Sequence, residues 1–162
     1  MKTTAVKLMA VLAVFAVFAS SQVAAQGMGG QPAKPIEELA GNYRNGMFHG
    51  IDFNYQLMNG MYRGSVEKND ELFLKAASDL HTLSGLVTVG FVMGTQEYAK
   101  LSTDAVWDDQ EDFNNKMEDF QTKAGVLATA AEGGVDSAES DFNSLRQTCG
   151  GCHRNYRQRV TR

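Results

Sequence analysis

The only two cysteines of the chain stand three residues apart near its C-terminal end, and a histidine follows the second one directly. The stretch reads Cys149-Gly150-Gly151-Cys152-His153. The surrounding apolar residues recur every three or four positions, which predicts a helix. Residues three and four apart on a helix share a face. The chain must therefore fold so that one helix face presents both thiols and the imidazole together.

The first 25 residues predict a secretory signal peptide. Lys2 and Lys7 precede about a dozen apolar residues, and small residues follow at Val23 and Ala25. The apolar run is shorter than the roughly 20 residues that span a bilayer, so a retained membrane anchor is the weaker interpretation. We expect cleavage after Ala25, a flexible Gly-rich segment over 26–34, and one folded domain over 35–162 in the periplasm.

The cysteine pair has three interpretations in such a compartment. A disulfide between residues one helical turn apart closes a very small loop and constrains the unfolded chain little. A thioredoxin-like CxxC motif belongs in a βαβ setting, and no strand pattern flanks this one. A CxxCH stretch in an exported chain is the attachment signature of a c-type haem. We therefore expect one haem c, with thioethers at Cys149 and Cys152 and iron bound by His153; a labile disulfide or a chance metal pair is less favoured.

The charge balance limits the partners of the mature chain. The full sequence has 15 Lys and Arg against 19 Asp and Glu, and loss of Lys2 and Lys7 leaves 13 basic residues and a net charge of −6. Nucleic-acid binding requires a basic face, and the only arginine cluster lies at the end of one expected helix. We expect no nucleic-acid partner, and no membrane association once the signal is removed.

Four segments with helical periodicity follow the Gly-rich region, and turn signals separate them. Each opens on residues suited to a helix start: Pro35, Asn69 or Asp70, Asp108 with Glu111, and Asp136 with Glu139. A loop is expected around Val92–Trp107, and Gly133-Gly134 are expected to end the third helix. Four amphipathic helices with short connections predict an all-α antiparallel four-helix bundle with covalently attached haem. The haem would add apolar core to a small, glycine-rich domain.

Two glycines within the first segment, Gly46 and Gly50, lie four apart. Interior helix glycines each cost about 1 kcal/mol relative to alanine. They indicate either a weak helix tolerated by packing or a face that another group approaches closely. Close packing is favoured.

Several stretches in this order resemble the cytochrome c′ family, the class II c-type cytochromes. They are KP at 34–35 with YR at 43–44, SGLVTVGF at 84–91, VWDDQEDFNNKMEDFQ at 106–121, LATAAEGG at 127–134, and the terminal CGGCHRNYR. The position of CxxCH at the end of a fourth helix is typical of that family. The resemblance implies a homodimer with iron that is usually five-coordinate, and binding of nitric oxide and carbon monoxide, with a periplasmic redox partner as a further expectation.

The resemblance also implies roles for individual residues. Arg44 and Asn45 match an arginine near the haem propionates and the polar residue after it. Phe48, four after the arginine, matches the residue over the open face of the iron, and Arg157 matches an arginine near the proximal face. The Ser84–Phe91 match places Phe91 among the cofactor-binding residues.

The function depends on whether the sixth iron position is open. Met47 would close it and give a six-coordinate, low-spin electron carrier of the c-556 type, but it lies one residue, about 100° of helix rotation, from the matching position. The expected apolar stripe of the first segment centres on Met47, which favours a core role there. Its members are Ile36, Leu39, Tyr43, Ile51, Asn54 and Met58. His49 and His81 are expected at the surface or its boundary. We therefore predict a gas-binding haem protein behind Phe48, not an enzyme, because no acid–base group is expected over the iron.

Overall fold

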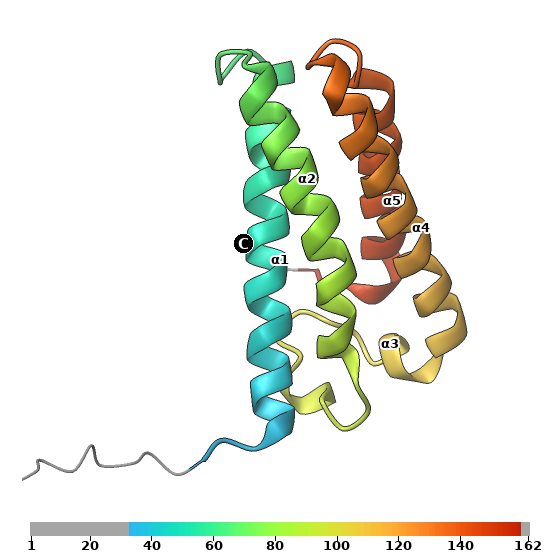
Figure 1. Ribbon diagram of the computed structural model, residues 1–162. Coiled ribbons are helices and arrows are strands. Elements are labelled where there is room, and N and C mark those ends of the chain that lie inside the picture. The colour runs from blue at the N-terminus through green and yellow to red at the C-terminus, as the bar shows by residue number, and fades with distance from the viewer. Residues whose placement is uncertain (1–32, 160–162) are drawn as a thin grey trace, which may run out of the picture. The chain divides into compact units, whose positions relative to one another are not determined.

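The computed structural model describes residues 33–159, and the segment from Lys34 onward forms one compact unit. Four long helices follow one another in antiparallel order (Figure 1): α1 (Ile36–Tyr62), α2 (Asp70–Leu86), α4 (Gln110–Ala130) and α5 (Glu139–Tyr156). This confirms the all-α four-helix bundle. The predicted signal peptide and most of the Gly-rich segment lie outside the described residues, so those predictions stay predictions. None of the described helices is long and apolar enough to cross a membrane.

The long connection between α2 and α4 contains more structure than the sequence predicts. It holds two short 3₁₀ helices, η1 (Val87–Phe91) and η2 (Gln96–Tyr98), and one turn of α-helix, α3 (Ala105–Asp108). The η1 segment packs along the first half of α1, where an added Cβ on Gly90 would lie 2.6 Å from the Cβ of Arg44. Glycine at this position lets the connection approach α1 closely, which brings loop residues to the bundle interior.

The helix starts are confirmed at two of the four predicted places. α1 begins directly after Pro35, and Asn69 caps α2 by accepting a hydrogen bond from the backbone N–H of Leu72 at 2.8 Å. The cap of α4 is Asp109 rather than the predicted Asp108, which instead ends α3. Asp109 accepts from the backbone N–H of Asp112 at 3.3 Å.

The predicted cap of the last helix is wrong. α5 begins at Glu139 after Ala138, which has no polar side chain to cap it. Asp136 instead forms an exposed ion pair with Lys68 in the turn between α1 and α2. The turn before α5 is held to the start of α2 by Asp70, whose carboxylate accepts a hydrogen bond from the backbone N–H of Val135 at 2.8 Å. A short η3 (Ala131–Gly133) and Gly134, at φ +91°, end the preceding helix as predicted.

The two glycines of α1 have different surroundings. An added Cβ at Gly50 would lie 2.9 Å from Cδ1 of Leu83 on α2, so Gly50 is a close-packing position. Gly46 is exposed and has nothing within 4 Å of that point. The favoured interpretation, close packing, therefore holds for Gly50 alone.

The bundle buries the predicted apolar stripe of α1 only in its later turns. The buried residues of the helix include Arg44, Ile51, Asn54, Met58 and Met61. The predicted stripe residues of the first two turns are exposed: Ile36 by 70%, Leu39 by 46% and Tyr43 by 36%. Hydrophobic spacing identified one face of the helix, but the bundle covers only part of it.

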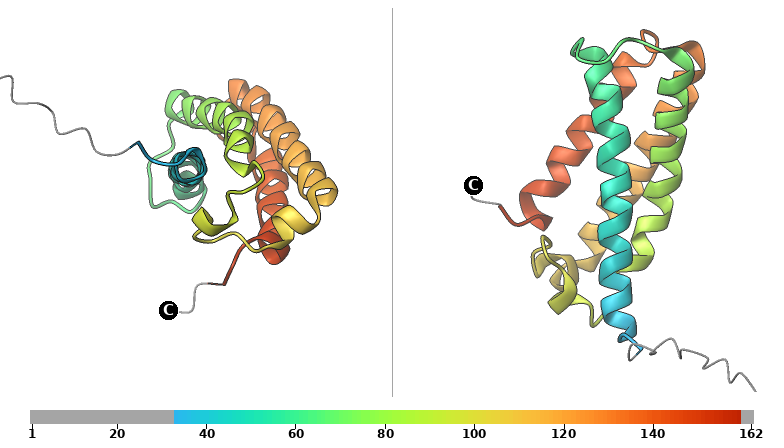
Figure 2. Two further views of the ribbon diagram at one scale, coloured as in Figure 1. Left: turned by 90° about the horizontal axis from the view of Figure 1, so that it is seen from below. Right: turned by 90° about the vertical axis from the view of Figure 1, so that its left-hand side faces the viewer.

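Helices α1 and α5 meet through aromatic side chains at one end of the bundle. Phe142 of α5 packs against Tyr55, with ring centroids 5.4 Å apart, and against Tyr62 at 4.9 Å. The Tyr62 hydroxyl also donates to the backbone carbonyl of Val135 at 2.7 Å. From this end α5 runs obliquely away from α1 (right view of Figure 2). The Cys149–His153 segment therefore lies on the part of α5 that diverges from α1.

Candidate haem site

The last turns of α5 bring the two cysteines and His153 together. Cys149 and Cys152 are half-buried against the core and both thiols are free. Burial raises the pKa of Cys149 to about 11 and also raises that of Cys152. A catalytic or redox-active cysteine shows the opposite shift, because the thiolate is its reactive form. Neither thiol therefore has the lowered pKa that is typical of a reactive cysteine.

His153 lies at the exposed edge of the same helix face. Its pKa is lowered from the ordinary value, first by the burial of part of the ring and then by the charge of Arg157, one turn further on. The imidazole is thus neutral at neutral pH, which is the form that binds a metal. Among the described residues no cluster of three or more His, Cys, Asp or Glu side chains could hold an ion alone. One neutral histidine beside two thiols suits a metal-containing cofactor in which the cofactor itself supplies most of the ligands to the metal.

Arg44 is the most unusual charged residue of the bundle. It is 1% exposed, and its Nη1 donates to the carbonyl of Gly90 at 2.5 Å and to Oγ1 of Thr95 at 3.3 Å. Its Nη2 is buried without a hydrogen-bond partner among the described residues, and no carboxylate there forms an ion pair with it. Burial lowers the pKa of Arg44. A buried cation without a counter-charge is costly, so this site suits an anionic group such as a haem propionate.

Two aromatic rings complete the surroundings of Arg44. The guanidinium carbon lies 4.8 Å from the ring centroid of Phe91 and 5.7 Å from that of Trp107. Trp107 is itself fixed, because its Nε1 donates to the carbonyl of Val92 at 3.2 Å. Cation–π contacts of this kind stabilise a desolvated guanidinium. The connection between α2 and α4 therefore holds the arginine in place on the α1 side of the site.

Phe48 lies one turn after Arg44 and is half-buried. Its ring meets that of Phe91 edge-on, with centroids 6.0 Å apart and planes at 75°. Phe48 precedes Tyr55 by seven residues, so the two share one side of α1, and that side faces α5 through the Tyr55–Phe142 contact. Three predicted site residues, Arg44, Phe48 and Phe91, are thus in mutual contact or adjacent.

The comparison with known proteins agrees with this geometry. Residues 40–157 match the family model described as Cytochrome C′. The chain belongs to the cytochrome c′ family. Its cofactor is accordingly haem c, as predicted. The two free, half-buried thiols, the neutral imidazole and the unpaired Arg44 Nη2 all fit that group. Cys149, Cys152 and His153 are the residues that would hold it.

Individual members of the family resemble the chain over nearly all of the bundle. Cytochrome c-554 of Cereibacter sphaeroides is 26% identical over 134 residues, which covers 80% of this chain and 99% of the relative. Cytochrome c prime from Shewanella frigidimarina superimposes with a TM-score of 0.72 at 28% identity, covering 76% of this chain and 97% of that structure. A carbon monoxide complex of a cytochrome c prime variant from Alcaligenes xylosoxidans superimposes with a TM-score of 0.70 at 25% identity, covering 80% of this chain and 100% of that structure. Nitric oxide complexes of other variants of that protein give the same TM-score, identity and coverage.

Met47, the alternative residue for the iron, is half-buried like Phe48 but lies on another side of this cytochrome c′-family helix. Gly50, one turn further, packs on Leu83 of α2, and Asn54, seven residues further, is buried. These positions share the side of Met47. Met47 is therefore directed toward the α2 side of the core, and Phe48 toward α5.

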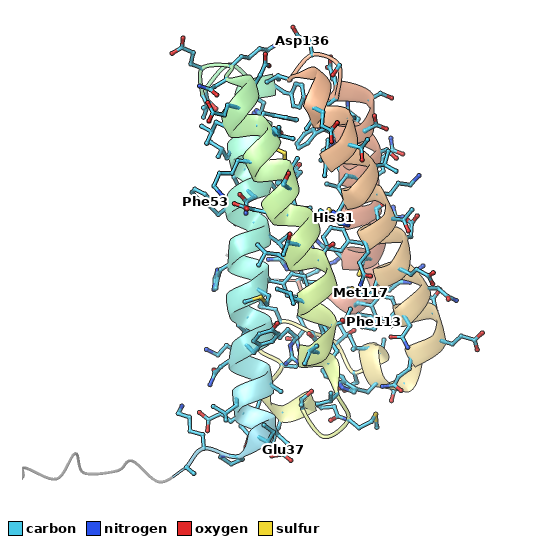
Figure 3. All side chains as sticks on the ribbon, in the orientation of Figure 1. Glu37, Phe53, His81, Phe113, Met117 and Asp136 are labelled. Carbon is cyan, nitrogen blue, oxygen red and sulfur yellow. The ribbon has the colours of Figure 1, made fainter. Side chains whose placement is uncertain are left out.

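The remaining predicted residues are at the periphery. His49 is exposed on α1, and His81 is exposed on α2, with Nε2 only 3.2 Å from the point where a Cβ on Gly125 of α4 would lie. Figure 3 shows His81 on α2, facing α4. Asn45 is half-buried beside Arg44, and Arg157 is exposed after the last turn of α5. The surface or boundary assignments of both histidines agree with the structure.

Two further contacts of the site could not be predicted from the sequence. The Tyr156 hydroxyl donates to Oδ2 of Asp112 on α4 at 2.5 Å, and its ring packs edge-on against Phe113 at 5.3 Å. After Tyr156 the backbone pairs with the connection: Thr103 N–H donates to the Tyr156 carbonyl at 3.1 Å, and Arg157 forms a bridge with Ser102. The turn of α5 after His153 is thus fixed from two elements.

A depression of about 290 Å³ lies beside Cys152, between α4 and α5. Side chains of α4 and α5 line it, with Lys116 and Asp119 from the first and Thr148 from the second. Thr148 donates to Asp119 at 3.1 Å across the depression. Its walls include the cysteine itself, so it forms part of the same site.

Proposed function

We propose that this chain is a periplasmic c-type haem protein that binds small diatomic gases, nitric oxide and carbon monoxide, at an iron position covered by Phe48. When bound, the haem would supply an iron atom that can take up a small neutral ligand, and His153 would hold that iron. The observation that carries the proposal is the orientation of Phe48: it lies on the α5 side of α1 and against Phe91, whereas Met47 shares the side of Gly50 and its α2 contact. The gas complexes solved for the Alcaligenes relatives support the same conclusion.

Phe48 would act by exclusion. A phenyl ring neither coordinates a metal nor donates a hydrogen bond, so its effects are steric and dielectric. Water and larger ligands are excluded, while small neutral diatomics enter when the ring rotates. Bound oxygen needs a hydrogen-bond donor for its charge separation and would be poorly stabilised beside Phe48. Carbon monoxide and nitric oxide need that donor much less.

The same surroundings support a binding protein rather than an enzyme. Peroxidase-like or nitric-oxide-reducing chemistry needs an acid–base group within hydrogen-bond reach of the bound ligand. The other two described histidines offer no such group: His49 is exposed on α1, and His81 is exposed on α2, where it faces Gly125 of α4. Phe48 offers no proton. A periplasmic redox partner would supply the electron that keeps the iron ferrous for carbon monoxide binding.

The exposed apolar surface supports the homodimer that we infer. Ile36, Leu39 and Tyr43 of α1 lie along the segment that carries Leu86 and Val89, and the Tyr43 hydroxyl donates to the Leu86 carbonyl at 3.2 Å. Contiguous exposed apolar surface marks a protein contact. Leu39→Lys should convert the dimer to monomer in light scattering. Val126→Lys is the control, because Val126 is 47% exposed and Leu39 46%; a dimer that survives Leu39→Lys would contradict this assignment.

The test of the gas-binding proposal is the rate of carbon monoxide association with the ferrous protein. Phe48→Ala should raise that rate by about tenfold, the effect of about 1.4 kcal/mol on the barrier. Met47→Leu is the matched control, because it removes the thioether of the preceding residue and keeps an apolar side chain. It should leave the rate unchanged. An unchanged rate in Phe48→Ala would overturn the steric gate, and a large increase in Met47→Leu would instead identify Met47 as the iron ligand of an electron carrier.

A further inference from the structure

Phe48 does not stand alone but begins a continuous row of aromatic rings. Phe48 meets Phe91 at 6.0 Å, Phe91 meets Phe113 at 4.8 Å, and Phe113 meets Tyr156 at 5.3 Å. The four rings come from α1, η1, α4 and α5 in turn. Figure 3 labels Phe113 on α4 in the lower part of the bundle. The row therefore connects the proposed gate on α1 to the helix that carries the haem ligands.

Phe91 is the ring of this row with contacts on the most sides. Phe113 packs on it at an interplanar angle of 57°, and the guanidinium of Arg44 lies over it at 4.8 Å. Its backbone is fixed as well, because the carbonyl of the preceding Gly90 accepts from Arg44 at 2.5 Å. A side chain held by a ring, a cation and its own backbone has little freedom to move. Phe91 is therefore a rigid surface for the edge of Phe48.

We propose that Phe91 is a specificity-determining residue, which restricts the rotation of Phe48 and so sets how fast diatomic gases pass it. This inference rests on the proposed function, in which Phe48 covers the iron. For the Phe48 ring to rotate out of its present orientation, either the Phe91 ring must move or the Phe48 ring must pass it without contact. Both rings are half-buried and meet edge-on at 6.0 Å. A neighbouring ring that cannot yield at this distance limits the rotamers available to Phe48.

The other end of the row, Phe113 and Tyr156, restricts the movement of Phe91 on the side that faces α4 and α5. Phe113 is 5% exposed and lies between Phe91 and Tyr156, and the Tyr156 hydroxyl bonds to Asp112, the residue before Phe113. The ring of Tyr156 and the carboxylate next to Phe113 thus fix α4 to the last turn of α5. Phe113 therefore cannot retreat to make room for Phe91.

The test is a double-mutant cycle on carbon monoxide and nitric oxide association with the ferrous haem protein. Phe91→Leu should raise the association rate of carbon monoxide about fivefold. It should raise that of nitric oxide less, because we expect the association barrier for nitric oxide to be smaller, so that the Phe91 ring contributes less to it. Added to Phe48→Ala, it should change neither rate further. Phe120→Leu is the control, since Phe120 is 8% exposed, lies on α4 and is not part of the row; it should leave both rates unchanged.

Each outcome of the cycle decides between the two proposals. If Phe48→Ala accelerates binding and Phe91→Leu does not, Phe91 has no gating role and the gas-binding proposal stands. If the two substitutions multiply, Phe91 acts independently of Phe48 and this inference is wrong. If Phe48→Ala has no effect, the gate itself is wrong.

A second measurement reads the motion directly and does not depend on ligand kinetics. The ring-flip rate of Phe48, followed by NMR with labelled phenylalanine in the diamagnetic ferrous carbon monoxide complex, should rise in Phe91→Leu and stay unchanged in Phe120→Leu. If Phe91→Leu does not fold, Phe113→Leu replaces it, because it removes the ring behind Phe91, and an increase of the same sign is expected. An unchanged flip rate in the folded variant overturns the inference.

Discussion

The guanidinium of Arg44 lies 4.8 Å from the ring centroid of Phe91, and its Nη2 is buried without a partner among the described residues. One residue of α1 thus carries a positive charge into the interior, and one residue of η1 covers it. The Arg44 charge is available to an anionic group of the cofactor, while the Phe91 ring supports Phe48. The two proposed features of the site, cofactor charge and ligand gate, are therefore adjacent.

Replacing Arg44 should change the haem reduction potential. A buried positive charge favours the reduced iron, so Arg44→Met should lower the midpoint potential by an amount on the order of tens of millivolts, the scale of a charge at about 10 Å in a medium of intermediate dielectric constant. Potentiometric titration measures it. Arg63→Met is the control, because Arg63 is exposed at the opposite end of α1. A potential that rises or stays constant in Arg44→Met would contradict the assignment of Arg44 to the cofactor.

Two glycines of α1 offer a comparison within one helix. An added Cβ at Gly41 would lie 2.6 Å from Cβ and 3.0 Å from the carbonyl oxygen of Tyr98, so Gly41→Ala should lower the free energy of unfolding by about 1–3 kcal/mol. Gly46 has nothing within 4 Å of its added Cβ. Gly46→Ala should raise that free energy by about 1 kcal/mol through helix propensity alone. Urea denaturation measures both; equal effects would mean that η2 does not pack on α1 as described.

The Tyr156–Asp112 hydrogen bond should stabilise the last turn of α5. Tyr156→Phe keeps the ring on Phe113 and removes only the hydroxyl, so it should increase amide hydrogen exchange at 153–156 without altering the far-ultraviolet circular dichroism. Asp112→Asn should have the same effect, and the double variant should exceed neither single one because both remove one interaction. Tyr62→Phe removes a comparable buried hydroxyl contact at the other end of the bundle. Equal exchange at 153–156 in Tyr156→Phe and Tyr62→Phe would refute the local role.

The same contact predicts a pH dependence. The hydrogen bond from Tyr156, followed by that of Lys116, lowers the pKa of Asp112 below its usual value of 3.8. A lowered folded-state pKa contributes stability that is present above the unfolded pKa and is lost as the pH falls through the folded one. The stability difference between the natural chain and Asp112→Asn should therefore be constant at neutral pH and shrink below about pH 4. A difference that grows toward acid pH would show that Asp112 is not stabilised as a carboxylate.

The sequence predicted the parts of the fold that depend on local pattern. Helical spacing located all four long helices, and the face shared by Cys149, Cys152 and His153 follows from the helix repeat alone. Spacing could not distinguish a face covered by the bundle from one left exposed, so Leu39 was expected in the apolar stripe and is exposed. With acidic residues at both 108 and 109, pattern also could not select the true cap of α4.

The contacts of Arg44 could not be predicted from the sequence, for a different reason. Gly90, Thr95 and Trp107 lie 46 to 63 positions further along the chain and come from a connection without a periodic pattern. Only the folded arrangement brings them to α1. The same holds for Tyr156 and Asp112, 44 positions apart. Trp107, the single tryptophan of the chain, stood out in the sequence, but nothing there indicated that it would pack against Arg44.

The central claim is that Phe48, and not Met47, faces the iron, and the absorption spectrum of the purified haem protein tests it most directly. With Phe48 over an open position, the ferric and ferrous forms should show high-spin bands, and the ferrous spectrum should shift at once when carbon monoxide is added. A methionine–iron charge-transfer band in the far red, with low-spin ferric bands and no response to carbon monoxide, would contradict the claim and identify a six-coordinate electron carrier with Met47 as the ligand.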